Sequence, residues 1–276
     1  MATDQTHDGR TDEHAVQLEA GQARLTIHPD RGCRVASLTV DGVELLRQGE
    51  KFGSFPMVPW CGRTRDGQFR NGGVLHQLPR DAGPHAIHGT GRHTAWQQAP
   101  GATATDVSFY YDLAEPWPYK GRVTQRFSLT EDHAELTMSV ETTGDSFPAQ
   151  AGWHPWFLRN LGRGGQDAEI AFSPGWMEQR GEDHLPTGQR VDPTPRPWDD
   201  CFGMPDGVDV TLTWPGELRL RTTSPAPWVV LYDEQPEAVC VEPQSGPPNG
   251  LNSDPRLVTP LEPLEMRATW AWERLG

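Results

Sequence analysis

Hydrophobic and polar residues alternate along most of this chain, with the two-residue period of a β-strand that buries one face. Near the start, Val16, Leu18, Leu25 and Ile27 alternate with polar residues. Further runs predict strands at residues 38–40, 43–45, 107–113, 123–129, 136–140, 208–214, 218–222, 228–232, 238–241 and 266–272. Asp41-Gly42 separates the first two of these runs and indicates a hairpin turn. Since no amphipathic helix longer than two turns and no internal repeat is evident, we predict an all-β fold, a large antiparallel β-sandwich.

Two segments interrupt the alternation. Residues 52–96 are rich in Gly, Pro, His and Arg, and residues 179–202 are polar and contain several prolines. We expect both to be long irregular loops, which is where a rigid β scaffold usually carries its binding residues.

Charge and hydropathy exclude two classes of partner. The chain has 276 residues and a net charge of −14, which argues against nucleic acid because phosphates would be repelled. No stretch approaches the roughly 20 consecutive apolar residues of a membrane span. Residues 1–14 are polar and lack the apolar part of a secretory signal, so we interpret them as a disordered tail. We expect residues 15–276 to form a single domain.

The four cysteines, Cys33, Cys61, Cys201 and Cys240, are far apart and match no zinc-binding spacing. In a chain without a visible export signal, they are expected to be reduced thiols of a cytoplasmic protein.

Two ionisable residues stand in apolar, strand-like runs. His154 lies in Gly152-Trp153-His154-Pro155-Trp156-Phe157, and Glu242 lies in Cys240-Val241-Glu242-Pro243. An apolar setting moves the pKa of either group towards neutrality, which suits proton transfer on a neutral substrate. Each also has an ordinary interpretation, because a histidine among tryptophans is often structural and a glutamate that ends a strand is often a rim charge.

Two polar runs supply candidate binding groups. The first holds Arg63 and Arg65, whose guanidinium groups can bind hydroxyls or anions, or can stay solvated on a surface hairpin. The second, Trp198-Asp199-Asp200-Cys201-Phe202, holds two carboxylates that can accept hydrogen bonds from a diol or can form a loop turn.

His85 and His88 stand three residues apart in a run flanked by Gly and Pro. Their spacing allows a metal-binding interpretation, but no nearby Cys, Asp or Glu completes a ligand set. A neutral histidine that hydrogen-bonds a hydroxyl fits better, since imidazole can both donate and accept.

Taken together, these runs resemble the aldose 1-epimerase (galactose mutarotase) superfamily. The resemblance rests on motifs at residues 56–63, 85–89, 152–157, 199–202 and 241–244, with Asn252 beyond them, in the family's order. It extends over residues 15–273. One departure is Gly62, before the arginine, where many relatives have Asn.

The resemblance implies a large β-sandwich with its site in an open cleft, a sugar substrate, and neither metal nor cofactor. It implies that Glu242 is the general base for the anomeric hydroxyl and that His154 is the general acid for the ring oxygen. Three further residues would orient the sugar hydroxyls: Arg63, His88 and Asp199. Arg65 and Asp200 remain alternatives in the register of their motifs.

Two other functions stay open. One is a binding module that recognises a sugar without acting on it. The other is a glycosidase that uses Asp199 and Glu242 as a carboxylate pair, roughly 5–9.5 Å apart, which leaves His154 without a role.

The sequence names neither the sugar nor the oligomeric state. The negative net charge favours a neutral aldose, since an anionic one would need a local basic pocket, with candidates Arg63, Arg65, Arg80 and Arg92.

Overall fold

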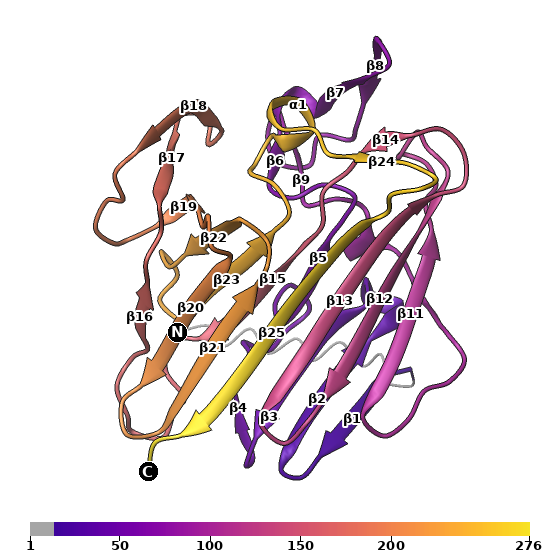
Figure 1. Ribbon diagram of the computed structural model, residues 1–276. Helices are drawn as coiled ribbons and strands as arrows, with labels where there is room; N and C mark the ends of the chain where they lie inside the picture. Colours follow the sequence, from indigo (N-terminus) through magenta and orange to yellow (C-terminus); the bar gives the residue numbers. More distant parts are fainter. Residues whose placement is uncertain (1–13) are drawn as a thin grey trace, which may run out of the picture.

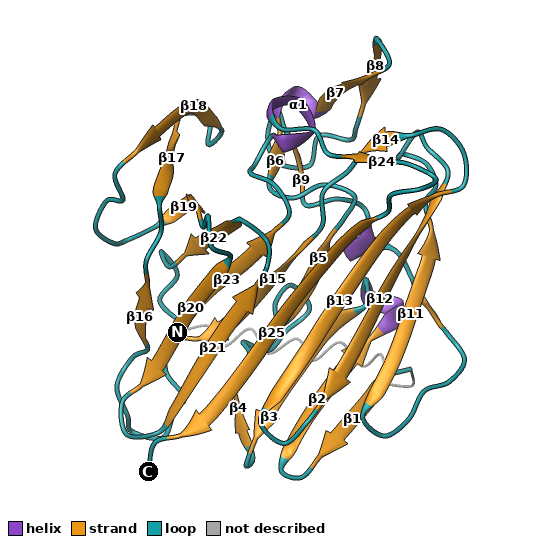
Figure 2. Cartoon of the chain, viewed as in Figure 1, coloured by secondary structure: helices purple, strands orange, loops and turns teal. Residues whose placement is uncertain are grey.

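The computed structural model describes residues 14–276, so the tail expected at residues 1–14 lies outside the described residues except for His14. Two large antiparallel sheets pack face to face (Figure 1). Within the described part, the one α-helix, α1 (Gly250–Ser253), is a single turn, and strands dominate the chain (Figure 2). No helix there is long and apolar enough to cross a membrane. The predicted all-β antiparallel sandwich is confirmed.

The larger sheet has 11 strands. Its order is β1 (Val16–Ala20), β2 (Ala23–His28), β3 (Arg34–Val40), β5 (Ser54–Met57), β15 (Gly152–Leu158), β23 (Ala238–Gln244), β22 (Trp228–Tyr232), β19 (Asp199–Gly203), β17 (Trp176–Arg180) and β18 (Pro186–Val191), with β4 (Val43–Glu44) paired to β3.

The second sheet has eight strands. Its order is β10 (Gln97–Gln98), β11 (Asp106–Asp112), β12 (Gly121–Leu129), β13 (His133–Thr142), β25 (Leu264–Arg274), β21 (Leu218–Ser224), β20 (Val208–Trp214) and β16 (Glu169–Phe172). Smaller pairs join β6 (Arg63–Thr64) to β9 (Ala86–Ile87), β7 (Gln68–Asn71) to β8 (Val74–Gln77), and β14 (Phe147–Pro148) to β24 (Leu257–Val258). Short 3-10 helices are η1 (Pro29–Arg31), η2 (Arg65–Gly67) and η3 (Gly91–His93).

The strands predicted from alternation are confirmed, since they fall on β1 to β4, β11 to β13, β20 to β23 and β25. The expectation of two long irregular loops was wrong in part. Residues 52–96 contain β5 to β9, and residues 179–202 contain the end of β17, all of β18 and the start of β19. The side chains of β18 are exposed on both faces, so no buried face imposes an alternating pattern on its sequence. Asp199 and Asp200, expected in a loop, begin β19 within the sheet.

Alternate residues of the central strands point to opposite faces of the larger sheet. The inner face contributes to the core between the sheets through Trp153, Phe157, Val239 and Val241. The opposite face carries His154, Trp156, Cys240 and Glu242. Above this outer face, the β17–β18 hairpin rises on one side and β6, β9 and α1 lie on the other (Figure 1). The polar residues of the central strands are therefore directed away from the main core.

Candidate active site

Strand pairing arranges the outer-face side chains in two rows, because residues directly opposite one another in antiparallel strands point to the same face. The first row crosses β15, β23, β22 and β19 and consists of His154, Glu242, Val230 and Cys201. The second row lies two residues along each strand and consists of Trp156, Cys240, Tyr232 and Asp199.

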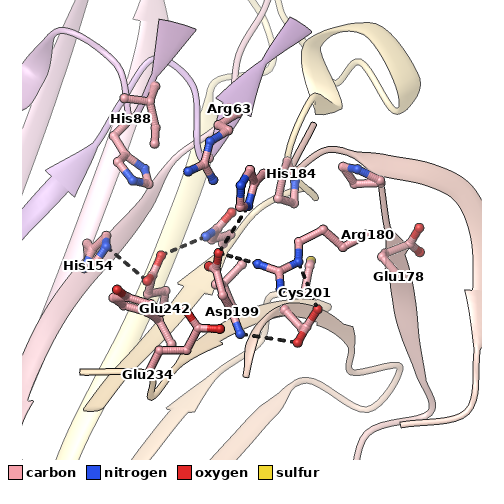
Figure 3. Close-up of a pocket in the computed structure, with 18 residues that line it drawn as sticks. Arg63, His88, His154, Glu178, Arg180, His184, Asp199, Cys201, Glu234 and Glu242 are labelled. Carbon is pink, nitrogen blue, oxygen red and sulfur yellow. Dashed lines mark hydrogen bonds and ion pairs between the residues drawn. The ribbon is translucent and has the colours of Figure 1, made fainter. Parts of the chain in front are cut away.

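These rows border a cavity of about 380 Å³, which is in the size range of small-molecule sites. Its walls come from residues near β6 and β9 and from the β17–β18 hairpin (Figure 3). All five residues that the sequence analysis selected line this cavity: Arg63, His88, His154, Asp199 and Glu242. The fold therefore brings together groups from five separate segments of the chain.

His154 and Glu242 are in direct contact. The distance from His154 Nε2 to Glu242 Oε1 is 3.1 Å, and the two side chains are only 8% and 3% exposed. Gln244 Nε2 donates a hydrogen bond to the other oxygen of the Glu242 carboxyl group, at 3.2 Å. The carboxyl group is thus oriented from both sides.

The imidazole of His154 lies between two aromatic rings. Phe55 stacks at 4.6 Å between ring centroids and Trp156 stacks at 5.1 Å. The ring of His88 meets His154 edge-on, also at 5.1 Å. This packing fixes the plane of the imidazole and keeps bulk water from its faces.

Burial moves the pKa values of the pair in opposite directions, so the expectation that both would move towards neutrality was wrong for His154. It raises the pKa of Glu242 well above the usual carboxyl value, and the nearby charge of Asp199 raises it further. Burial lowers the pKa of His154 to about 3, and the charges of Arg92 and Arg34 lower it as well. The low-polarity setting thus favours the uncharged forms, with a single proton held on Glu242 and facing a neutral imidazole.

Asp199 is held by an arginine from the hairpin. Arg180 Nη1 donates to Asp199 Oδ2 at 2.5 Å, and Arg180 Nε lies 3.6 Å from Asp200 Oδ1. Burial raises the pKa of Asp199, and the charges of Arg180 and Arg63 oppose that rise. His184 Nδ1 lies 3.8 Å from the same Asp199 oxygen (Figure 3).

The geometry distinguishes the two candidate arginines. Arg63 lines the cavity, whereas Arg65 forms an ion pair with Asp183 at 2.7 Å. Asp199 and Asp200 both line the cavity, so the structure leaves both in reach of a ligand.

Sequence reasoning missed the hairpin's contribution to the cavity, namely Glu178, Arg180 and His184. These residues lie in or beside the segment interpreted as an irregular loop. Only their polarity could have marked them, and polar residues of an exposed hairpin look the same whether or not they face a site.

His85 has a structural role, because its Nδ1 accepts a hydrogen bond from the backbone N–H of Asp66 at 3.1 Å. Within residues 14–276, one group of side chains has ligand atoms close enough for a metal, with all atoms within 4.8 Å: His154, Cys240 and Glu242. Burial raises the pKa of the Cys240 thiol and of Glu242, which disfavours the anions that a metal would need. The cluster therefore fits proton transfer better than metal binding.

Residues 14–263 match the protein family described as aldose 1-epimerase. The uncharacterized protein YphB of Escherichia coli K12 is 28% identical over 264 residues, which cover 84% of this chain and 88% of that protein. Among solved structures, a galactose mutarotase-like protein from Clostridium acetobutylicum superposes with a TM-score of 0.82 at 17% identity, covering 94% of this chain and 95% of that one. The galactose 1-epimerase of Lactobacillus acidophilus superposes with a TM-score of 0.78 at 16% identity, covering 95% of each chain.

The two structural likenesses show a shared fold, and the family match extends over nearly all of the described residues, including every residue of the cavity named above. This chain belongs to the aldose 1-epimerase family.

Proposed function

We propose that this protein is an aldose 1-epimerase that interconverts the α and β anomers of a sugar by opening and closing its ring, without a cofactor. The observation that carries the proposal is the contact between His154 Nε2 and Glu242 Oε1. In a cyclic aldose, the anomeric hydroxyl and the ring oxygen are bonded to the same carbon atom. A base for the first oxygen and an acid for the second must therefore be immediate neighbours, as these two groups are.

Ring opening needs one proton acceptor and one proton donor. Glu242 removes the proton of the anomeric hydroxyl while His154 protonates the ring oxygen, so the bond from C1 to the ring oxygen breaks and an aldehyde forms. Rotation about C1–C2 then presents the other face of the carbonyl. On closure the two groups exchange roles, and no covalent bond to the protein is required.

The pair can supply both roles because it holds one exchangeable proton. In the free protein, burial favours that proton on Glu242. Its transfer across the 3.1 Å contact gives an ionised Glu242 and a protonated His154, which is the form that opens the ring. After ring opening the proton sits on Glu242 again, so the cycle returns to its starting state.

Arg63, His88 and Asp199 are proposed to orient the sugar hydroxyls from the cavity walls. The contact from Arg180 fixes the carboxylate of Asp199 and makes Arg180 a positioning residue. Alignment of substrate with the acid and base is itself a large part of catalysis in such a site.

The two competing functions fit the geometry less well. A binding module has no need of an acid placed against a base. A glycosidase would use Asp199 and Glu242 across a scissile bond, but here Asp199 is bound by Arg180 and Glu242 is in contact with His154. The role of His154 is explained only by the epimerase.

We further propose that residues 15–276 act as one domain, because one hydrophobic cluster extends from Leu18 to Trp272. A cytoplasmic location is supported by the cysteines, which are all buried free thiols.

Anomer exchange followed by NMR tests the proposal. Freshly dissolved α-anomers of glucose, galactose and xylose are mixed with the purified protein, and the exchange rate is compared with that of buffer alone. Acceleration proportional to enzyme concentration supports the proposal. Rates equal to buffer with every sugar of this panel and with charged derivatives would contradict it.

A further inference from the structure

A second cavity, of about 580 Å³, adjoins the first at His88 and His154, which line both. Its character is basic, with lining residues Arg31, Arg34, Lys51, Arg92 and His93. The acidic side chain on its lining is Glu50, which is exposed. Phe55 and Trp156, the two rings that hold His154, form part of its wall.

Arg34 is an unusual member of this lining because it is only 9% exposed. Its Nη1 donates to the carbonyl oxygen of Phe52 at 2.6 Å, and its guanidinium lies 4.9 Å from the ring centroid of Phe55. The Nε atom is buried without a partner. Among residues 14–276, no carboxylate pairs with this arginine. Burying a cation without a counter-charge costs free energy, so its presence calls for an explanation.

Arg92 lies beside it. Arg92 Nη2 binds Asp81 at 2.8 Å, but its Nε is also buried without a partner. Burial, followed by the charge of Arg92, lowers the pKa of Arg34 to about 10, so each cation disfavours the other. Two arginines that line one cavity can hold an oxyanion with their guanidinium groups, and its negative charge would relieve the repulsion.

The structure of a hexopyranose indicates which part of a bound sugar would reach this cavity. In a hexopyranose, the ring oxygen links C1 to C5, and C6 is attached to C5. With Glu242 at the C1 hydroxyl and His154 at the ring oxygen, a group on C6 extends beyond His154 and away from Glu242. The cavity that begins there is the basic one. We propose that Arg34 and Arg92 bind an anionic group on C6 of the substrate, so that the sugar is a hexose carrying a carboxylate or a tetrahedral oxyanion at that carbon.

This inference rests on the proposed function and reverses the expectation of a neutral aldose. The net charge of −14 does repel anions at long range, but a local pocket overcomes that field at contact. Arg92 is among the candidates predicted from the sequence, and Arg34 is not. Of the other candidates, Arg65 pairs with Asp183, and Arg80 is exposed and lines neither cavity.

A bound anion would also affect the chemistry. The charges of Arg92 and Arg34 lower the pKa of His154, which makes its protonated form harder to reach. An anion between the arginines offsets that effect. We therefore expect the C6 anion to raise kcat as well as affinity, which a role in binding alone would not do.

The first test uses the wild-type protein and four sugars: glucose, glucuronic acid, glucose 6-phosphate and glucose 6-sulfate. Anomer exchange is measured at low and high ionic strength. At least one anionic sugar should exceed glucose in kcat/KM by roughly 10- to 100-fold, the range of a charge-assisted hydrogen bond, and salt should reduce the preference. A preference for glucuronic acid would identify a planar carboxylate, and a preference for the 6-phosphate or the 6-sulfate would identify a tetrahedral anion. Glucose turned over as well as every anionic sugar would overturn the inference and leave the epimerase intact, whereas no acceleration with any sugar would overturn both.

The second test compares variants by the ratio of kcat/KM for the preferred anionic sugar to that for glucose. Arg34→Gln and Arg92→Gln should each lower the ratio by about 10-fold or more. Arg70→Gln, an equal charge change at an exposed position of β7, is the control and should not alter it. Circular dichroism establishes which variants fold. If Arg34→Gln does not fold, Arg92→Gln alone carries the test. An unchanged ratio in a folded variant of either arginine would overturn the inference.

Discussion

His154 and Glu242 fall opposite each other on the antiparallel strands β15 and β23, and their side chains meet at 3.1 Å on the outer face of the larger sheet. Strand register therefore fixes the contact. A slip of one residue in either strand would turn its ionisable group towards the core. The proposed acid–base pair is thus held by two central strands of the larger sheet, while the walls around it come from shorter elements.

The first prediction concerns stability and pH in Glu242→Gln. The folded protein raises the pKa of Glu242 above its unfolded value, so at neutral pH the folded state holds a proton that the unfolded chain has released. This group's contribution to stability is present in acid and is lost as pH rises above about 4.5. Glutamine resembles the protonated carboxyl and carries no such cost. We expect the variant to melt at a higher temperature than wild type at pH 8, with the gap closing below pH 4.5. A variant less stable than wild type at pH 8 would contradict the raised pKa.

The second prediction concerns His154→Asn. An acid that acts on the ring oxygen contributes mainly in the transition state, so kcat should fall by roughly 10²–10⁴-fold with a much smaller change in KM. Steady-state anomer exchange over a range of sugar concentrations separates the two constants. A large rise in KM with kcat retained would make His154 a binding residue.

The third prediction uses the pH profile of the wild type. The pair loses its function when it gains a second proton on His154 or loses its only proton from Glu242. Because the pKa of His154 is lowered to about 3, kcat/KM should show no acid limb at the ordinary histidine value of 6.5. An inflection near 6.5 that disappears in His154→Asn would show that the imidazole is not desolvated.

The fourth prediction concerns the neighbouring aspartates. The charge of Asp199 raises the pKa of Glu242, so Asp199→Asn should move the alkaline limb of kcat/KM to lower pH. It should also raise KM, since a group that we propose to bind the sugar is altered. Asp200→Asn is the matched control, and we expect it not to move that limb. A raised KM and a shifted alkaline limb in Asp200→Asn, with neither change in Asp199→Asn, would assign the binding role to Asp200.

The fifth prediction is that dialysis against EDTA leaves anomer exchange unchanged, because the proposed mechanism needs only the acid and the base. Loss of activity that a divalent ion restores would instead indicate a metal held by His154, Cys240 and Glu242.

The sequence predicted most of the central strands because one buried face imposes alternation on residues such as Val123 to Leu129 in β12. It marked His154 and Glu242 because an ionisable group in an apolar run is unusual. It missed the hairpin residues Arg180 and His184, because polar residues of a hairpin look the same whether or not they face a site. It also missed Arg34, since nothing near this residue in β3 differs from an ordinary strand arginine. Only the fold places its guanidinium beside Arg92 and the cavity at His154.

The proposed role of Glu242 as the base is tested by anomer exchange in Glu242→Gln. The variant keeps the shape and hydrogen bonding of the side chain but cannot accept a proton, so we expect a rate equal to that of buffer alone with an unchanged circular dichroism spectrum. Glu234→Gln, which alters an exposed carboxylate on the same cavity, is the control and should retain activity. Exchange by folded Glu242→Gln at a rate near that of the wild type would show that Glu242 is not the base.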